Sequence, residues 1–539
     1  MYSEEGLSGL QLEIWQSVSS GRAVKADPGY PEVPFDLIRQ LVLGHGPDRP
    51  RRLKLSGVQI TGDLDLEAAT LVCPLWLTDC RMGEWNFEQA EAKGIYLESC
   101  RFLGFRGSQL HTKHTLAITD CIVTGTVKLG GAKIDGQLVL ADTRITNLGK
   151  DALSADGLTV GQDLICTGRF TLAGGCHLIG AHIQGQFVAR GATFYNPGDM
   201  ALDASHLTVS EATHWDEGFT ATGEVRLIGA QIGGQFCCVR GTFSNSKGCA
   251  ILADGLEARR DVIFGPEGDS LNPEDITTVD GIVLTDAVIH GRLMCAGTRF
   301  SRAGDKAIRA RGLTVGRSLV LRDTTVVEGS IDLRRARVGE LADQGFAWPE
   351  KVLLVEFVYG GLQPINGVRE RIKWLKRNGS FSSQIYRQLA LAYRTAGHLE
   401  QADRVLVAEQ WARRRTPSRR FTRWFAQLKG AGLWATVGYG FSPLRILISL
   451  ILLEIAGGTL FSTQRKDISL TKAAQGAGAD FQPWLYSLDL LLPVVNLRQR
   501  DLVIVHGASA WCSSFFVIAG WALGTALVIG VGSAIKRTE

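Results

Sequence analysis

One acidic residue of this chain stands where a charge is costly. Glu454 lies in the middle of the apolar run LRILISLILLEIAGGTLF, from Leu444 to Phe461. A run of this length is about long enough to cross a bilayer, whose hydrocarbon core is roughly 30 Å thick. An acidic side chain at that depth indicates an ion or proton pathway. Glu454 therefore faces a pore, pairs with an arginine or with His506 of a neighbouring helix, or only fixes helix packing.

A second apolar run, from Leu502 to Ile535, is longer and is followed by two basic residues. Its charge-free core AWCSSFFVIAGWALGTALVIGVG predicts a second membrane helix. This run contains Gly520 and Gly524, and the GxxxG spacing favours close helix pairing in an oligomer.

The segment between the two runs has the pattern of a re-entrant helix. Residues 480–501 read DFQPWLYSLDLLLPVVNLRQRD, an apolar helical stretch that Pro493 stops before it is long enough to cross a bilayer. Half-helices of this kind occur inside membranes where they line a cavity. We expect the segment either to form a pore or to lie as an amphipathic helix on the outer surface. The candidate pore residues are Glu454, Tyr486, Ser487, Asp489, Pro493 and Asn496.

The pentapeptide TVGYG at residues 436–440 matches the loop whose carbonyl groups dehydrate potassium in potassium channels. In those channels the loop follows a membrane helix and a pore helix, whereas here it precedes the first apolar run. Phe441 also stands where such loops usually carry aspartate. We therefore interpret TVGYG as a glycine-rich turn that leads into Pro443 at the start of the helix.

Basic residues gather just before the first apolar run, among several aromatic side chains. The combination is compatible with nucleic acid, but its position favours anionic lipid headgroups, and we expect no nucleic-acid partner. The positive charge places both chain ends in the cytoplasm and the segment between the runs outside the cell membrane. The opening MYSEEGLSGLQLEIWQ lacks the apolar region of a signal peptide, which agrees with a cytoplasmic N-terminal part. The predicted headgroup-binding residues, here named the basic collar, are Arg413, Arg414, Arg415, Arg419, Arg420 and Arg423.

Other residues that could do chemistry lack a complete site. His111 with His114, and His177 with His182, have no third ligand set by the pattern, so we expect no metal. The sequence has no Walker A, GxSxG or HExxH motif, and we predict neither an enzyme nor a cofactor. The 11 cysteines are scattered without a CxxC pair, which predicts reduced and mostly buried thiols.

The larger N-terminal part of the chain is built from repeats. The phrase ALSADGLTVG at Ala152 recurs with variation at Ala201, Ala250 and Ala307, at spacings of 49, 49 and 57 residues. A second phrase with the same spacings starts near Ile134. Apolar and polar residues alternate within each phrase, and Gly, Asp and Asn separate the phrases. This pattern predicts short strands joined by tight turns.

Coils of about 20 to 26 residues bury their inward side chains only by stacking on one another. The repeats therefore predict a mainly β fold, a right-handed parallel β-helix, at residues 51–345. We expect a helical N-terminal cap at residues 1–50 and a helical segment with the basic collar at residues 346–430. A two-span membrane domain follows at residues 431–539.

The segment SSQIYRQLALAYRTAGHLEQADRVLVAEQWARRR, which starts at Ser382, predicts two helices joined at Gly397. It resembles a single tetratricopeptide-type hairpin. Because such hairpins bind partners in arrays of three or more repeats, one copy implies a structural adaptor.

These motifs carry resemblances to known families. Over residues 50–345 the repeat resembles pentapeptide-repeat and bactofilin-like β-helix proteins. The phrase YSLDLLLPVVNL resembles the pore-helix region of channel-like domains appended to bacterial pentapeptide-repeat proteins. The whole architecture, from LQLEIWQSVSSGRAV to the two spans, resembles actinobacterial proteins labelled membrane-associated oxidoreductases. The residues themselves offer no redox site, because the adjacent Cys237 and Cys238 would point to opposite faces of a strand.

Two functions fit this organisation. In the first, the spans assemble into an oligomeric, ion-channel-like pore, and the cytoplasmic β-helix acts as its sensor. In the second, the spans only anchor a scaffold whose β-helix recruits proteins. The expected partners are the lipid bilayer, further copies of the chain and a protein bound to the β-helix surface.

Overall fold

The computed structural model describes residues 2–26, 28–47, 50–265, 276–322, 325–365, 367–415, 443–471, 480–492 and 495–535. The chain forms two compact units, Met1–His398 and Leu399–Glu539, and each is described by itself.

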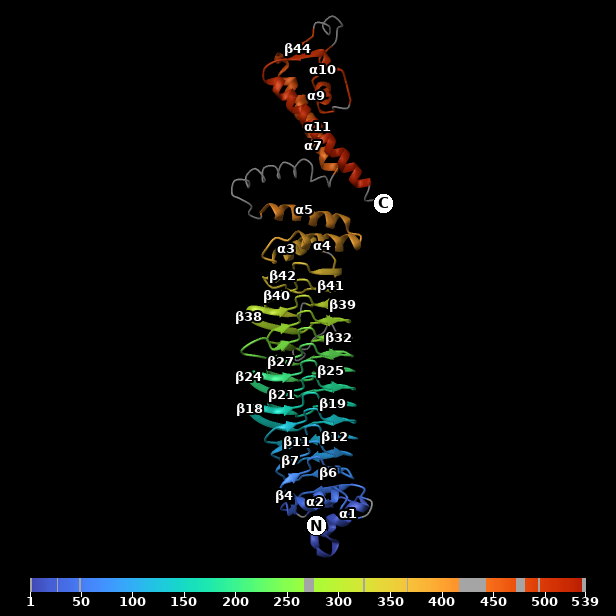
Figure 1. Cartoon of the computed structure of the whole chain (residues 1–539). Helices are drawn as coiled ribbons and strands as arrows, with labels where there is room; N and C mark the ends of the chain where they lie inside the picture. The colour runs from blue at the N-terminus through green and yellow to red at the C-terminus, as the bar shows by residue number, and fades with distance from the viewer. Residues whose placement is uncertain are drawn as a thin grey trace. The chain divides into compact units, whose positions relative to one another are not determined.

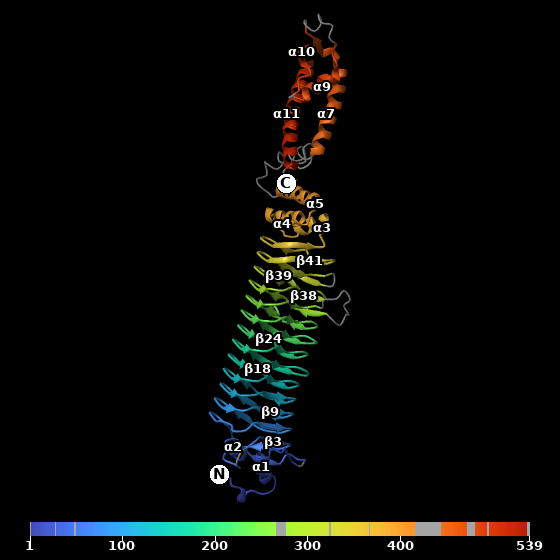
Figure 2. The ribbon, with the colours of Figure 1, turned by 90° about the vertical axis from the view of Figure 1, so that its right-hand side faces the viewer.

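The first unit is a mainly β parallel solenoid of about 14 turns, as the repeats predict. Its coils stack along one axis, and their strands line up into long parallel sheets (Figure 1). Among the described residues, one sheet has 24 strands and the other has 17. Most strands are only two to four residues long, because a turn follows each short apolar phrase. The view in Figure 2 shows the same stack turned by 90°.

The strand register places equivalent apolar residues of successive coils directly above one another. Leu53 of β3 (Leu53–Ser56) pairs with Leu75 of β6 (Leu75–Thr78), which pairs with Ile95 of β9 (Ile95–Glu98). All three side chains are fully buried. A column of this kind removes apolar surface from water at about 25 cal/mol per Å².

A column of phenylalanine rings fills the middle of the solenoid. The distances between the centroids of successive rings are 5.7, 5.5 and 5.3 Å, and every ring is buried. Tilted aromatic pairs at this distance stabilise by about 0.5–1.5 kcal/mol beyond the area they bury. The residues are Phe170, Phe194, Phe219 and Phe243.

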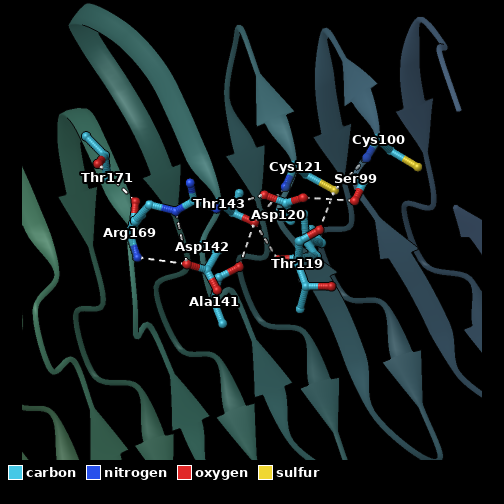
Figure 3. A network of polar contacts seen from close by, with 11 residues as sticks. Ser99, Cys100, Thr119, Asp120, Cys121, Ala141, Asp142, Thr143, Arg169 and Thr171 are labelled. Atoms are coloured by element: carbon cyan, nitrogen blue, oxygen red, sulfur yellow. Dashed lines mark hydrogen bonds and ion pairs between the residues drawn. The ribbon is translucent and has the colours of Figure 1, made fainter. Parts of the chain in front are cut away.

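One corner of the first coils carries a ladder of sulfur and hydroxyl groups, here named the corner ladder. The backbone N–H of Cys80 donates to Cys100 Sγ at 3.4 Å, and that of Cys100 donates to Cys121 Sγ at 3.3 Å. The N–H of Cys121 donates to Thr143 Oγ1 at 3.2 Å. Figure 3 shows Cys100, Cys121 and Thr143 in this row. The ladder satisfies buried backbone donors where the chain turns between sheets.

Three long strands extend sideways from the stack as loops (Figure 1): β18 (Arg144–Ser154), β24 (Thr193–Asp203) and β38 (Thr298–Arg309). In β18 and β24 an asparagine closes the loop, because its Nδ2 donates to the carbonyl oxygen four residues later, at 2.9 and 2.8 Å. The register shifts at these loops, so they are bulges built into parallel strands. We name them the lateral loops.

Glycines lie beneath the lateral loops. Gly174 of β21 (Thr171–His177) and Gly223 of β27 (Thr220–Arg226) have φ angles of 129° and 124°. A Cβ atom at Gly223 would lie 2.5 Å from the carbonyl oxygen of Asn196. Only glycine fits where a loop backbone passes this close over the next coil.

Helices and short strands close the N-terminal end of the solenoid. These are η1 (Glu4–Gly6), α1 (Gly9–Ser20), β1 (Val24–Lys25), β2 (Glu32–Pro34) and α2 (Phe35–Val42). Strand β1 pairs with β3 and so extends the 24-stranded sheet, whereas β2 pairs with β4 (Gln59–Thr61) in a separate two-stranded sheet. A covered end is what a solenoid requires to hide its last apolar layer.

The strands continue past residue 345, where the sequence analysis placed the end of the solenoid, up to Gln363 of β43 (Val358–Gln363). The turn chemistry changes there, but KVLLVEFVYGGL still has strand periodicity. Helices α3 (Val368–Lys376) and α4 (Ser383–Thr395) follow. On α4, Gln388 Nε2 donates to the carbonyl oxygen of Tyr359 at 2.7 Å, which satisfies the edge of β43.

A buried ion pair ties α3 to the last coils. The Arg371 guanidinium forms a bidentate pair with the Asp343 carboxylate at 2.5 and 2.6 Å. Trp348 Nε1 donates to the same carboxylate at 2.7 Å. Two forked bonds and a third donor compensate for the desolvation of both charges.

The second unit contains α5 (Leu399–Arg415), α7 (Pro443–Thr463), α9 (Pro483–Leu491), α10 (Gln499–Leu502) and α11 (Ala508–Ile535). The described residues also include η4 (Arg465–Asp467) and an antiparallel pair of strands, β44 (Ile468–Leu470) and β45 (Val503–Val505). The two strands join the chain after α7 to the chain before α11.

Candidate functional site

The nine-residue helix α9 packs against both α7 and α11, and these two helices also contact each other. Figure 2 shows the three helices side by side. They share one apolar core, which is built from Phe461, Phe481, Tyr486, Leu490, Leu491, Val503 and Phe516. A helix of nine residues is only about 14 Å long at 1.5 Å per residue, so α9 cannot cross a bilayer. Its place is that of the predicted half-helix.

Small residues let the backbones approach. A Cβ atom at Gly457 of α7 would overlap Ser487 Oγ, and one at Gly458 would overlap the Trp484 ring. A Cβ atom at Gly520 of α11 would overlap the carbonyl oxygen of Leu491. Small residues at helix contacts are typical of membrane helix bundles.

Gly520 therefore contacts α9 of its own chain, whereas no described atom lies within 4 Å of a Cβ atom placed at Gly524. The GxxxG pattern does not single out Gly457 and Gly458, because these two glycines are adjacent. The sequence does contain a signal for this contact, namely two adjacent glycines inside an apolar helix. Such a pair weakens the helix unless a neighbouring segment packs against the glycines.

Glu454 lies three residues before Gly457 and therefore on the same face of α7. The Ser487 hydroxyl of α9, which packs on Gly457, interacts electrostatically with the Glu454 carboxyl group. Neither Glu454 Oε2 nor Ser487 Oγ is exposed, and neither forms a hydrogen bond of normal geometry within the described part of the chain. His506 instead approaches Ser469 Oγ at 3.3 Å. A shielded carboxylate oxygen and a shielded hydroxyl that approach only each other are costly unless a ligand or a neighbouring chain adds a further hydrogen-bond partner.

Asp489 fixes the chain that follows α9. Its side chain is 2 % exposed and accepts hydrogen bonds from the backbone N–H groups of Leu497 and Arg500, each at 3.0 Å. The Arg500 guanidinium donates to the carbonyl oxygen of Asp489. Asp489 thus holds α10 against α9, and Arg500 is its structural partner, which no local sequence pattern indicates.

The other candidate pore residues are dispersed. Tyr486 is buried, with its ring centroid 5.0 Å from that of Phe461 and 5.5 Å from that of Phe481. Asn496 is exposed, and its side-chain oxygen accepts from the backbone N–H of Arg498 at 2.8 Å. Pro493 lies outside the described residues. Of the predicted set, the structure brings Glu454 and Ser487 together.

The outer faces of α7 and α11 are apolar. Trp511, Phe515, Ile518 and Trp521 of α11 are 58–82 % exposed, and their spacing places them on one side of the helix. On α7, five neighbouring side chains are 48–61 % exposed: Leu447, Ile448, Ile451, Leu452 and Ile455. An apolar surface of this extent marks contact with a membrane or with another protein.

Within the described residues, one helix is long and apolar enough to cross a membrane, Ala508–Thr525 of α11. The apolar segment Leu447–Thr463 of α7 is shorter than a membrane-crossing helix, so the first predicted span, from Leu444 to Phe461, is not confirmed.

The basic collar is described only in part. Arg413, Arg414 and Arg415 belong to α5, and the Arg413 side chain is exposed. Arg419, Arg420 and Arg423 lie outside the described residues, as does TVGYG.

Three histidines of the solenoid, His111, His177 and His290, pair with carboxylates of neighbouring coils. His111 Nε2 lies 2.9 Å from an Asp135 oxygen, and His177 Nε2 lies 3.0 Å from an Asp151 oxygen. Exposed pairs of this kind add little stability.

All 11 cysteines are free thiols, and ten of them are buried. Burial raises the pKa of the Cys295 thiol to about 12. The hydrogen bond with Cys121 raises the pKa of Cys100, and burial adds to the shift, to about 12 in all. Both thiols are therefore protonated at neutral pH and poor nucleophiles.

Comparisons with protein-family models, curated proteins and solved structures found no match to the chain.

Proposed function

We propose that the chain is a non-enzymatic, multi-pass protein of the cell membrane, and that its second unit is the subunit of an oligomeric ion-conducting pore. In this proposal α7 and α11 cross the bilayer and α9 is the half-helix between them. The solenoid and both chain ends lie in the cytoplasm, where the solenoid serves as sensor or interaction domain.

The observation that carries the proposal is the buried half-helix. A helix too short to cross a bilayer lies between two helices whose outer faces are apolar. In a membrane, backbone that does not span is tolerated where it is enclosed by protein or lines a cavity. The order of α7, α9 and α11 along the chain and the packing of α9 between the other two helices agree with the arrangement of a two-helix channel subunit.

Glu454 and Ser487 form the polar centre of this proposal. Glu454 is partly buried, and its Oε2 atom and the hydroxyl oxygen of Ser487 are both shielded from solvent, so the two residues supply oxygen ligands that a cation prefers. We expect Glu454 to set conduction, because it is the acidic side chain in the middle of α7.

The test is ion flux in liposomes that contain the purified full-length protein. We expect wild type and the matched control Thr459→Val to conduct, because Thr459 is exposed on α7 and its hydroxyl binds only backbone of its own helix. Glu454→Gln and a chain ending at Gly430 are expected to lose the flux. A folded wild-type oligomer without flux contradicts the pore.

The second candidate function is a membrane-tethered scaffold, and the lateral loops favour it. They repeat along one side of the solenoid and expose apolar side chains, such as Leu148 at 63 % and Tyr195 at 43 %. A repeated ridge suits recognition of another protein. If the scaffold is correct, a chain ending at Gly430 keeps partner binding in pull-down, and Leu148→Ser with Tyr195→Ser removes it.

A further inference from the structure

One column of outward-facing residues on the 24-stranded sheet changes its chemistry in two adjacent coils. The column is aliphatic in the coils on either side, with Val188 before and Ile263 after, but His214 of β26 (Thr213–His214) pairs in register with Cys237 of β29 (Phe236–Cys237). The part of the column from β17 (Leu138–Val139) to β39 (Thr314–Val320) consists of Val139, Ile165, Val188, His214, Cys237, Ile263, Met294 and Val320.

A carboxylate completes the change. Asp216 lies two residues after His214, and its Oδ2 is 3.3 Å from His214 Nδ1. The ligand atoms of His214, Asp216 and Cys237 all lie within 4.8 Å of one another. One repeat earlier and one repeat later, the position of Asp216 holds Thr167 and Gly265. His214, Asp216 and Cys237 therefore occur together in this pair of coils, and the equivalent positions of the neighbouring repeats do not carry the same three side chains.

Arg190 of the preceding coil orients the carboxylate. Arg190 Nε donates to Asp216 Oδ1 at 3.1 Å, and Arg190 Nη2 lies 3.5 Å from His214 Nδ1. A carboxylate oxygen of Glu217 lies 4.0 Å from Arg190 Nε. The Asp216 side chain is 9 % exposed. Arg190 therefore donates to Oδ1 of Asp216, while Oδ2 of the same carboxylate faces His214. Residues that hydrogen-bond to metal ligands commonly orient them in this way.

Imidazole nitrogen, carboxylate oxygen and thiolate sulfur are together the ligands that zinc takes in proteins. We propose that His214, Asp216 and Cys237 bind one Zn²⁺ ion on the outer face of the solenoid, with water in the fourth position. The other cross-coil pairs in the described structure bring no thiol to the imidazole; they are His111 with Asp135, His177 with Asp151, and His290 with Glu257.

The test uses Co²⁺ as a spectroscopic probe for the site in the metal-free, untagged full-length protein. A cobalt–thiolate bond gives a charge-transfer absorption band that other ligands do not give. We expect one Co²⁺ per chain with this band, and Zn²⁺ should displace it. Zn²⁺ should also raise the unfolding temperature of the solenoid, since ligands that bind the folded state stabilise it.

The variants His214→Ile and Cys237→Val restore the aliphatic residues that flank the site in the column, so they should keep the fold, which circular dichroism checks. Both should lose the band and the Zn²⁺-dependent stabilisation, whereas the matched control His177→Ala should keep both. Cys237→Ser is a second variant that preserves the thiol's size and should also lose the band. No band in wild type, or an undiminished band in any folded variant at 214 or 237, overturns the proposal.

Discussion

At the scale of single residues, the corner ladder requires a hydrogen-bond acceptor of small size at each step. Cys100 Sγ accepts from the N–H of Cys80, and Thr143 Oγ1 performs the same role for Cys121. We expect Cys100→Thr to be nearly neutral. Cys100→Val should lower the free energy of unfolding by about 1–3 kcal/mol, because it leaves a buried N–H without a partner. Urea unfolding measures the stability of both variants. Equal losses of unfolding free energy in Cys100→Thr and Cys100→Val would show that packing, and not the hydrogen bond, determines the contribution of Cys100.

Asp332, at the end of β40 (Val326–Asp332), makes the solenoid sensitive to acid. Burial alone would raise the pKa of its carboxyl group, but hydrogen bonds from Arg334 and Lys306 outweigh burial and lower the pKa to about 2. A lowered pKa contributes stability at pH values above the ordinary pKa of 3.8, and this contribution is lost as the pH falls toward 2.

We therefore predict that Asp332→Asn destabilises the solenoid by roughly 1–3 kcal/mol at pH 7. The difference from wild type should shrink between about pH 4 and pH 2. Glu328→Gln is the matched control, since the Arg299–Glu328 pair is half exposed and should change stability by less than about 1 kcal/mol. If the difference in unfolding free energy between Asp332→Asn and wild type is the same at pH 2 as at pH 7, the effect of Asp332 comes from side-chain packing and not from its charge.

At the scale of elements, each lateral loop depends on the glycine of the following strand. Gly223 has a φ angle that favours glycine, and the carbonyl oxygens of Asn196 and Asp199 lie close to where a Cβ would stand. We expect Gly223→Ala to cost about 2–3 kcal/mol through strain and displacement of the loop. Gly149→Ala, at a loop tip with no described neighbour within 4 Å, should cost about 1–2 kcal/mol. The shift of the urea midpoint distinguishes the two variants. A smaller loss of unfolding free energy for Gly223→Ala than for Gly149→Ala contradicts the role of Gly223 beneath the loop.

The exposed face of α11 predicts direct contact with lipid chains. Trp511 and Trp521 lie on this face, whereas Trp215 is fully buried in the solenoid. In liposomes with brominated acyl chains, tryptophan fluorescence should be quenched. We expect Trp511→Phe and Trp521→Phe to reduce the quenched fraction, and Trp215→Phe to leave it unchanged. Equal quenching in all variants would mean that this face meets protein instead of lipid.

At the scale of the whole molecule, the solenoid is nearly one-dimensional, because each coil contacts only its neighbours along the stack. Both of its ends are covered, by α1 and α2 on one side and by α3 and α4 on the other. We predict that a chain ending at His398, the boundary of the first compact unit, keeps the circular dichroism and the thermal midpoint of the solenoid within a few degrees. A loss of β structure on truncation would show that the second unit is needed for folding.

The sequence by itself determined the solenoid. Its repeat of 49 residues carries the two-residue alternation of buried and exposed side chains, and in a parallel stack this local pattern is also the packing pattern. The sequence pattern does not locate the end of the solenoid, because the turn residues change near residue 345 while the strands continue to Gln363.

Only the tertiary structure decided which polar residues meet. Glu454 and Ser487, the corner ladder, and His214 with Cys237 come from segments about 20 or more residues apart, and no local periodicity specifies their contact. Gly457 and Gly520 likewise acquire their role only through the close approach of α9. Register between coils and packing between helices are long-range properties, so spacing along the chain indicates the elements but not the partners they bring together.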